Sequence, residues 1–250
     1  MKYASLILCA ILLLPSVSRR KTDGYGGGFP ENTSETSADG AFSAEALFPP
    51  YRPMGRLTEA VGELAEGCEL ELLYADKDTY TALFDGKQYL LKRSAVRPFS
   101  CDVTRLPPVS DGEIERASAL FCRAVDSPYL LWVDLARLES YLLKRSEGAW
   151  QLLRRLPCSA GDLAHPTPRG LFSVSSHRPS LGKEDKYRAV YALHLRDDYF
   201  LHSVLLSPEG NEISDGRLGT RVSHGCIRHS VEDSRYLYRT LPDGAAVLIR

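Results

Sequence analysis

The sequence predicts a mainly β protein: a β-sandwich-like C-terminal domain with one helix near its end, preceded by a smaller β domain. Three observations support this fold class. Short apolar runs recur along the chain between Gly, Pro and Asp-Gly turns, which is typical of antiparallel strands. A single segment, after Ser230, has clear helix start and stop signals. With 44% hydrophobic residues in 250, the chain has enough apolar material for a core.

The first 18 residues are expected to be a secretory signal peptide. Lys2 precedes an apolar stretch at residues 4–14, and small residues follow at 16–18. The stretch is about half of the roughly 20 residues that a spanning helix needs, so we expect export without stable membrane insertion. The arginines that follow are untypical after a cleavage site, and an uncleaved anchor therefore stays open as an alternative.

A flexible linker and a small β domain are expected next. Residues 19–43 are rich in Gly, Ser, Thr and Asp and have almost no apolar periodicity. Residues 44–98 contain the turn Asp85-Gly86, a strong hairpin signal, between strand-like runs. The order of these runs resembles a bacterial SH3-like barrel, and that resemblance implies a module that helps exported enzymes engage the cell wall. The runs lie at 69–73, 80–84 and 88–91.

Residues 99–127 are expected to connect the two domains through an amphipathic helix, because apolar residues recur on one helical face between positions 111 and 125. The connector contains Cys101 and Cys122. A disulfide between them is one option, but four cysteines allow three pairings and the sequence does not decide. Without the signal peptide the number of cysteines is odd, so at least one thiol stays unpaired. The alternative is that all of them are reduced and buried. These cysteines are Cys68, Cys101, Cys122, Cys158 and Cys226.

Residues 128–250 are expected to form the β-sandwich-like domain. Its one confident helix begins at Ser230, which with Asp233 forms an N-terminal capping pattern, and ends before the turn at 242–244. The expected strands are separated by Gly and Pro turns. They lie at 130–134, 140–144, 150–153, 170–174, 188–193, 199–201 and 245–249.

The residues of the segment Ser223-His224-Gly225-Cys226 are those expected in a tight turn that presents a reactive thiol. A glycine between histidine and cysteine suits a turn where the backbone approaches a substrate closely. The thiolate is the reactive form, and a free thiol pKa of about 8.5 is lowered by a nearby imidazole, cation or helix N-terminus. His224 or His202 could supply the imidazole, Arg228 the cation, and the helix after Ser230 the N-terminus. Cys226 is therefore the expected nucleophile.

This turn and its neighbours resemble the signature of the L,D-transpeptidase catalytic domain family. The signature is a histidine, a spacer, Ser/Thr-His-Gly-Cys and, after one further residue, Arg or Asn. The matching residues are His202, the turn at 223–226 and Arg228. The likeness covers about residues 128–250, nearly half of the chain. It implies the L,D-transpeptidase fold and an extracytoplasmic enzyme, in the cell wall or periplasm, whose partners are peptidoglycan stem peptides.

The chain departs from the family pattern at two places. His202 and Cys226 are 24 positions apart, which is longer than the usual spacer. We expect the polar loop at 208–216 to absorb the extra residues, since a loop insertion can leave its ends in place. His229 stands where the family usually has an apolar residue, and it is expected either at the rim of the site or in the core.

The resemblance implies catalytic roles for four residues. Cys226 would carry the acyl group and His202 would take its proton. Backbone N–H groups around Gly225 and Cys226 would stabilise the oxyanion. His224 would shape the turn, with an exchange of the base role between His202 and His224 as the alternative.

Three further residues are expected to bind substrate, namely Arg228, Ser223 and Ser203. For Arg228 an ion pair with a carboxylate such as Asp233 is the competing interpretation. Neither a cofactor nor a metal is expected. A zinc site built from histidines and Cys226 is a formal alternative, but its spacing matches no familiar zinc motif.

The implied reaction is a two-step acyl transfer through a Cys226 thioester, which releases D-alanine and passes the acyl group to an amine of a second stem peptide. Water as acceptor would give an L,D-carboxypeptidase, and an inactive wall-binding protein is an alternative from another class. A papain-like amidase usually places Cys before His, the reverse of the order here. The net charge of -1 gives no field that would attract nucleic acid, and we expect a monomer.

Overall fold

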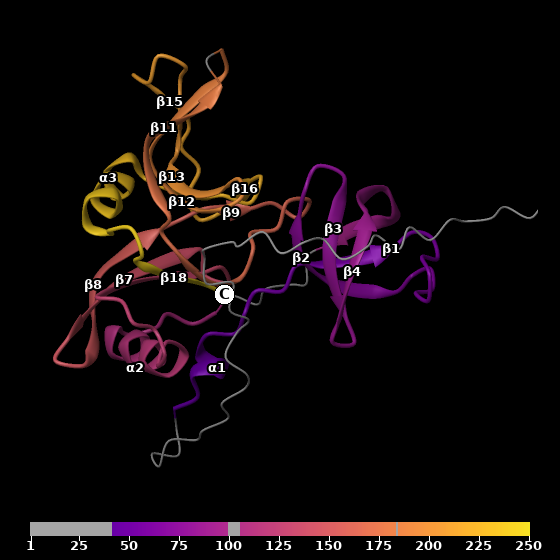
Figure 1. Ribbon diagram of the computed structural model, residues 1–250, viewed down its shortest axis with the longest axis horizontal. Coiled ribbons are helices and arrows are strands. Elements are labelled where there is room, and N and C mark those ends of the chain that lie inside the picture. The colour runs from indigo at the N-terminus through magenta and orange to yellow at the C-terminus, as the bar shows by residue number, and fades with distance from the viewer. Residues whose placement is uncertain (1–41, 100–105, 184) are drawn as a thin grey trace, which may run out of the picture.

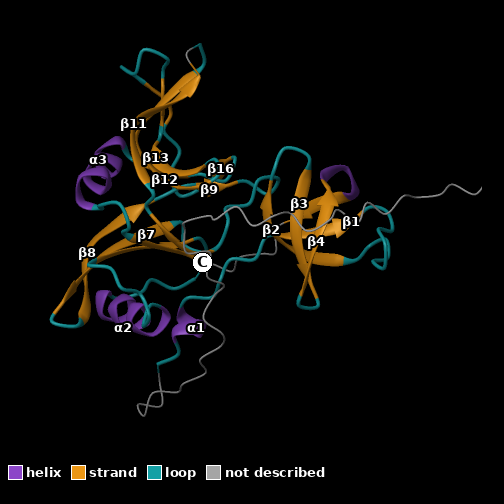
Figure 2. Ribbon diagram, in the orientation of Figure 1, coloured by secondary structure: helices purple, strands orange, loops and turns teal. Residues whose placement is uncertain are grey.

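The computed structural model describes residues 42–99, 106–183 and 185–250 (Figure 1). The predicted signal peptide, nearly all of the predicted linker and Cys101 lie outside these residues. Strands predominate in the described part of the chain and helices are short, which confirms the mainly β prediction (Figure 2). Within these ranges no helix is long and apolar enough to cross a membrane.

Residues 54–99 form a five-stranded antiparallel sheet, which we call the N-terminal β domain. The strand order is β4-β3-β2-β1-β5. The Asp85-Gly86 turn joins β3 to β4 with positive φ at both residues, 46° and 72°, as the hairpin signal predicts. Leu57, Leu72 and Tyr80 are central to its buried core. Its elements are β1 (Met54–Leu57), β2 (Glu69–Ala75), β3 (Thr79–Phe84), β4 (Lys87–Lys92), the 3-10 turn η1 (Arg93–Ala95) and β5 (Val96–Phe99).

Two larger sheets make up residues 128–250, the C-terminal domain. The first has the order β10-β18-β6-β7-β8, so that the last strand of the chain lies between two earlier ones. β18 runs parallel to β6 and antiparallel to β10. The strands of this sheet are β6 (Tyr129–Asp134), β7 (Glu139–Ser146), β8 (Ala149–Pro157), β10 (Gly170–Ser173) and β18 (Ala246–Ile249).

The second sheet has the order β15-β14-β12-β13-β17, and β11 also pairs with β12. Its β13 and β17 are parallel neighbours. A separate two-stranded pair joins β9 to β16. These strands are β9 (Ala160–Gly161), β11 (Ser176–Lys183), β12 (Tyr187–Arg196), β13 (Tyr199–Ser203), β14 (Leu205–Leu206), β15 (Ile213–Asp215), β16 (Arg221–Ser223) and β17 (Ile227–His229).

Strand β6 is buried on both faces, because side chains alternate across a strand and each face meets a different layer. Leu131 and Val133 join the core shared with the second sheet, which includes Ile227. Leu130 and Trp132 face the opposite way into a second core. This double burial explains the continuous apolar run at 130–133.

The second core is closed by α1 (Ala44–Leu47) and α2 (Asp111–Phe121), while α3 (Val231–Thr240) packs on β12 and β13. α2 begins with a capping box formed by Ser110 and Glu113. The structure differs from the predicted boundary at 44, because Phe48 of the following segment packs against Trp132 and not in the N-terminal β domain. The chain therefore leaves the C-terminal domain's outer layer, forms residues 54–99, and returns to it.

Candidate active site

The segment Ser223-His224-Gly225-Cys226 forms the turn between β16 and β17. The Ser223 hydroxyl donates to the Cys226 carbonyl at 2.5 Å and accepts the Gly225 N–H at 3.1 Å. These two bonds close the turn on itself and leave Cys226 immediately before β17. We call residues 223–226 the nucleophile turn.

Gly225 is required in this turn for two reasons. Its φ of 108° lies in a region that residues with a Cβ rarely adopt. A Cβ added there would also overlap Cε1 of Tyr199, whose ring fills the space beside the turn. The peptide that precedes Cys226 is therefore shaped by a glycine and an aromatic ring together.

Gly225→Ala is expected to destabilise the fold by about 1–3 kcal/mol through strain, with a further cost from the overlap with Tyr199. Gly219→Ala is the matched control, since Gly219 also has a positive φ, 68°, but an added Cβ meets nothing within 4 Å. Thermal unfolding should therefore show a clearly larger loss for Gly225→Ala. Equal losses would mean that Tyr199 does not restrict this position.

His202 lies on β13, and one of its ring nitrogens is committed to the backbone. Its Nδ1 is 2.6 Å from the carbonyl O of Ser203. A carbonyl only accepts, so Nδ1 carries the proton and donates. Burial lowers the pKa of His202 to about 4, and the charge of Arg228 adds to this effect. The imidazole is therefore neutral at pH 7, with Nε2 as an unprotonated acceptor.

The Cys226 thiol is half-buried and sits at the start of β17. Its Sγ donates to the Asp198 carbonyl at 3.5 Å. Burial raises the pKa of the Cys226 thiol, and this is opposed by a hydrogen bond from the Phe200 backbone and by the charge of Arg228. The resting thiol is thus protonated near neutral pH and needs a base to become a nucleophile.

Strand register brings the backbones of His202 and Cys226 close together. In the parallel β13–β17 pair His202 stands opposite Arg228, two residues after Cys226. A rise of about 3.3 Å per residue and a strand spacing of about 4.8 Å give a Cα separation of about 8 Å. Cys226 immediately precedes β17, and its Sγ donates to the Asp198 carbonyl, which comes just before β13. The 24-residue spacer contains β14 and β15, so that part of the segment predicted as a polar loop at 208–216 is a short strand.

The three residues predicted to bind substrate are occupied within the protein. Ser203 is fully buried, donates to the Val204 carbonyl and accepts the Val190 N–H. Ser223 is 1% exposed and closes the nucleophile turn. Arg228 is 8% exposed and donates to Asp215 on the inserted loop at 2.9 Å. Neither the Ser203 nor the Ser223 hydroxyl is accessible in this conformation, and their contact with substrate stays a prediction.

The carboxylate beside Arg228 is Asp215, and not Asp233 as the alternative had it. Asp233 pairs with Arg154 at 2.7 Å. Asp215 also binds Arg217, and these two guanidinium groups, with Arg217 the larger influence, hold the pKa of the Asp215 carboxyl well below its usual range. The inserted loop is thereby tied by an ion pair to the strand that follows Cys226.

His229 packs in the core and not at the rim. It is fully buried, and its Nε2 lies 3.0 Å from the Ser140 hydroxyl. Its Nδ1 has no partner among the residues that the structure describes. Burial lowers the pKa of His229 to about 3, and His202 adds to the shift. A neutral histidine therefore occupies the core directly behind the site.

Because His202 and His229 are buried and neutral, we expect the free energy of unfolding to decrease as the pH is lowered. Each has a folded pKa below the unfolded value of 6.5, so the unfolded chain takes up protons first as pH drops through about 6.5 toward 4. Each histidine then lowers the free energy of unfolding by up to about 1.4 kcal/mol per pH unit. At pH 5 the loss relative to neutral pH is about 2 kcal/mol for each histidine. His229→Gln keeps a group that can bond Ser140 but does not titrate.

Urea unfolding of the wild type and His229→Gln at pH 7.5 and pH 5 measures this difference. We expect the variant to lose about 2 kcal/mol less stability over that interval than the wild type does. Identical losses in both proteins would show that His229 is not neutral in the folded state.

Other groups near the turn were not recognised in the sequence. The exposed ring of His224 packs edge-on against His165, with centroids 4.3 Å apart. His165 Nδ1 lies 2.8 Å from Asp162, three residues earlier. The Asp-x-x-His spacing was the available signal for this pair. Tyr199, beside Gly225, gave no signal beyond its place in a strand.

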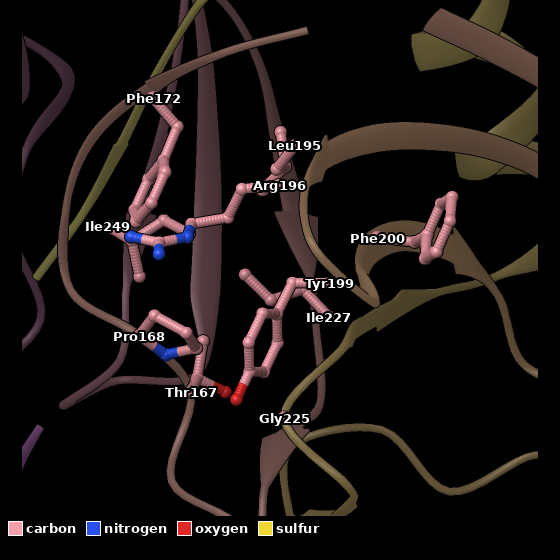
Figure 3. A pocket seen from close by; sticks show the side chains of 10 residues that line it. All are labelled: Thr167, Pro168, Phe172, Leu195, Arg196, Tyr199, Phe200, Gly225, Ile227 and Ile249. Atoms are coloured by element: carbon pink, nitrogen blue, oxygen red, sulfur yellow. The ribbon is translucent and has the colours of Figure 1, made fainter. Parts of the chain in front are cut away.

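A small pocket adjoins the nucleophile turn (Figure 3). Gly225 and Ile227 line it, but Cys226 between them does not. Figure 3 shows the Tyr199 ring reaching toward Gly225 and Thr167. The pocket is therefore a neighbour of the predicted reaction centre and not the centre itself. Its lining consists of Thr167, Pro168, Phe172, Leu195, Arg196, Tyr199, Phe200, Gly225, Ile227 and Ile249.

The remaining thiols that the structure describes are all free. Cys122 and Cys158 are buried, and burial raises the pKa of each to about 12. Cys68 is half-buried in the N-terminal β domain. In the described ranges no three His, Cys, Asp or Glu side chains gather as a metal site would require.

Comparisons with known proteins agree on the C-terminal domain. Residues 128–249 match the family model YkuD, described as the L,D-transpeptidase catalytic domain. YciB of Bacillus subtilis (strain 168), named as a candidate L,D-transpeptidase, is 30% identical over 89 residues, which cover 33% of this chain and 46% of YciB. The chain thus spans about half the length of that curated relative.

Solved structures resemble the chain at low identity. One is a fused Zn-dependent amidase, peptidase and peptidoglycan-binding protein of Clostridium acetobutylicum, with 24% identity, 60% of this chain and 67% of that chain covered, and a TM-score of 0.45. Another is an L,D-transpeptidase of Mycobacterium smegmatis, with 16% identity, 87% and 88% covered, and a TM-score of 0.39.

Proposed function

We propose that the protein is an exported enzyme that crosslinks peptidoglycan stem peptides through a thioester on Cys226, because residues 128–249 match the family model of the L,D-transpeptidase catalytic domain. The observation that carries this proposal is the pairing of β13 with β17. In this pairing His202, whose Nε2 is unprotonated, stands opposite Arg228, two residues after Cys226, which supports His202 as the base.

In the first half-reaction His202 Nε2 takes the proton of the Cys226 thiol. The thiolate attacks the carbonyl carbon of the third residue of a donor tetrapeptide, at the L-centre of its diamino acid. The amide bond to the terminal D-alanine breaks, and the imidazolium returns its proton to the departing amine. A thioester and free D-alanine result, and the base is regenerated.

The tetrahedral oxyanion needs N–H donors near the thiol. The Gly225 N–H is engaged by the Ser223 hydroxyl, so the sequence-based assignment of this amide to the oxyanion is revised. We assign the role to the Cys226 N–H, whose direction is fixed by the positive φ of Gly225. A donor in this role is worth roughly 3 kcal/mol in comparable acyl transfers.

In the second half-reaction an amine of another stem peptide attacks the thioester, forms the crosslink and frees the thiol. Water at the same step would give a tripeptide and hence an L,D-carboxypeptidase. Arg228 is neutralised by Asp215 in the free protein. A substrate carboxylate that binds this guanidinium would compete with Asp215 for it, which makes the loop that carries Asp215 the element that would respond to substrate.

The proposed location is outside the cytoplasm, where peptidoglycan is found. The apolar leader at residues 4–14 supports it. The N-terminal β domain remains our proposed SH3-like module, on the strength of its strand order and its hairpin.

Intact-mass and product analysis tests the proposal. The purified chain is incubated with a disaccharide tetrapeptide, and we expect a protein adduct of the donor lacking D-alanine, followed by a crosslinked dimer. If a tripeptide forms without a crosslinked dimer, the proposed activity changes from transpeptidase to carboxypeptidase. The absence of both adduct and product with every common stem peptide would contradict catalysis and leave wall binding as the function to examine.

A further inference from the structure

The N-terminal β domain contacts the C-terminal domain beside the nucleophile turn. Tyr80 Oη and Arg93 Nη2 both donate to the carbonyl O of Ala164, at 3.0 and 2.9 Å. Tyr80 is 2% exposed, and the Arg93 guanidinium lies over its ring, 5.1 Å from the centroid. Ala164 belongs to the loop at 162–167. This loop of the C-terminal domain is thus held from outside by a different domain.

The same contact fixes His165 in one orientation. Arg93 Nη2 lies 3.1 Å from His165 Nε2, and a guanidinium has only donors, so Nε2 must accept. Nδ1 then carries the proton and donates to Asp162 at 2.8 Å. Both ring nitrogens are engaged, one by each domain. This fixed ring packs against the ring of His224 in the nucleophile turn, with the two ring planes at 90°.

The loop also packs directly on the backbone of the nucleophile turn. Gly161 pairs with Ser223, and the Asp162 N–H donates to the Ser223 carbonyl at 2.9 Å. A Cβ at Gly161 would lie 3.0 Å from the Gly225 Cα and would overlap the His165 carbonyl. A shift of this loop would therefore be transmitted to Gly225.

A second contact from the N-terminal β domain reaches the same glycine. Tyr199 Oη donates to the Ala75 carbonyl of β2 at 2.9 Å. The Tyr199 ring is the group that an added Cβ at Gly225 would overlap. Two independent contacts of one domain, through His165 and through Tyr199, thus converge on the nucleophile turn, the first at His224 and the second at Gly225.

We propose that the N-terminal β domain is a positioning element of the active site, and that Arg93 acts through His165 and His224 to hold the nucleophile turn in its reactive shape. This inference rests on the proposed function for its effect on turnover. Its effect on the Cys226 thiol does not depend on the substrate, so the two can be tested separately.

The experiment compares Arg93→Ala with Arg56→Ala in the full chain. Arg56 is also an arginine of the N-terminal β domain, but it pairs with Glu69 at the exposed surface. The first readout is the rate of Cys226 alkylation by iodoacetamide, followed on the Cys226 peptide by mass spectrometry so that Cys68 does not contribute. The second readout is kcat and KM with a tetrapeptide donor.

We expect Arg93→Ala to change the alkylation rate at least threefold and to lower kcat about tenfold, with KM within twofold and the Tm as in Arg56→Ala. Arg93→Lys, which keeps a donor and the charge, should recover part of both. In a His224→Ala background the additional effect of Arg93→Ala should fall below twofold, because residues that act in series are not additive.

The outcomes separate this inference from the function. A changed alkylation rate without turnover on any stem peptide would contradict the proposed function and support the positioning role. Normal turnover with equal alkylation rates in Arg93→Ala and Arg56→Ala would overturn the positioning role and leave the function intact. Full additivity with His224→Ala would also overturn it, because Arg93 would then act by another route.

Discussion

Replacement of Cys226 by alanine is expected to abolish acyl-enzyme formation and to lower turnover of a tetrapeptide donor by at least about a thousandfold. The reason is that the reaction passes through a covalent bond to Sγ, and the nucleophile turn holds no second nucleophile at this position. Intact mass after incubation with donor reports the adduct, and chromatography of the products reports turnover. Both signals should be absent in the variant.

Two variants make this result specific. Cys226→Ser retains a nucleophilic atom but has a hydroxyl in place of a thiol, and we expect it to be nearly as inactive. Cys68→Ala removes a half-buried thiol of the N-terminal β domain and should react as the wild type does. If Cys226→Ala retained more than about a tenth of the activity, the thioester mechanism would have to be abandoned.

His202→Asn is expected to lower kcat/KM by about 10²- to 10⁴-fold, the range typical of a lost general base. The asparagine amide can still donate to the Ser203 carbonyl in place of Nδ1–H. The variant therefore removes Nε2 and its basicity while keeping the local backbone contact. His194→Asn, on the neighbouring strand β12 and bonded to Ser175, serves as the control and should retain wild-type activity.

The pH profile distinguishes a base from a structural histidine. The pKa of His202 is about 4, so its base form persists as pH falls from about 7.5 to 5.5, and wild-type kcat/KM should be nearly flat there. Without a base only the thiolate reacts. Burial raises the pKa of the Cys226 thiol, so the variant's rate should rise about tenfold per pH unit. Parallel profiles for the two proteins would remove His202 from the role of base.

Much of the fold follows from local sequence signals. Strands β6 to β8 have apolar runs, and the β3–β4 turn has the Asp-Gly pair that its positive φ values require. Strand β11 was missed because its residues are mostly polar and it pairs only with β12, so that no alternating pattern marks it. Strands β16 and β17 have three residues each, which is too short for any periodicity.

The candidate site likewise contains residues that the sequence indicates and residues that it does not. Cys226 and His202 were recognisable because a nucleophile and its base require particular side chains in a turn and at a strand end. The contact of Arg93 with His165 joins residues 72 positions apart in two domains, and no local pattern reports such a contact. Asp215 was equally hidden, since an ion pair across an inserted loop depends on how that loop folds back.

The place of β18 has a consequence for the order in which the protein is built. Because β18 lies between β10 and β6, the first large sheet stays open until residues 246–249 have been synthesised. The N-terminal β domain, by contrast, is complete at Phe99. During synthesis from the N-terminus, the N-terminal β domain can thus fold about 150 residues before the first large sheet is complete. The nucleophile turn reaches its final surroundings only after β18 is inserted.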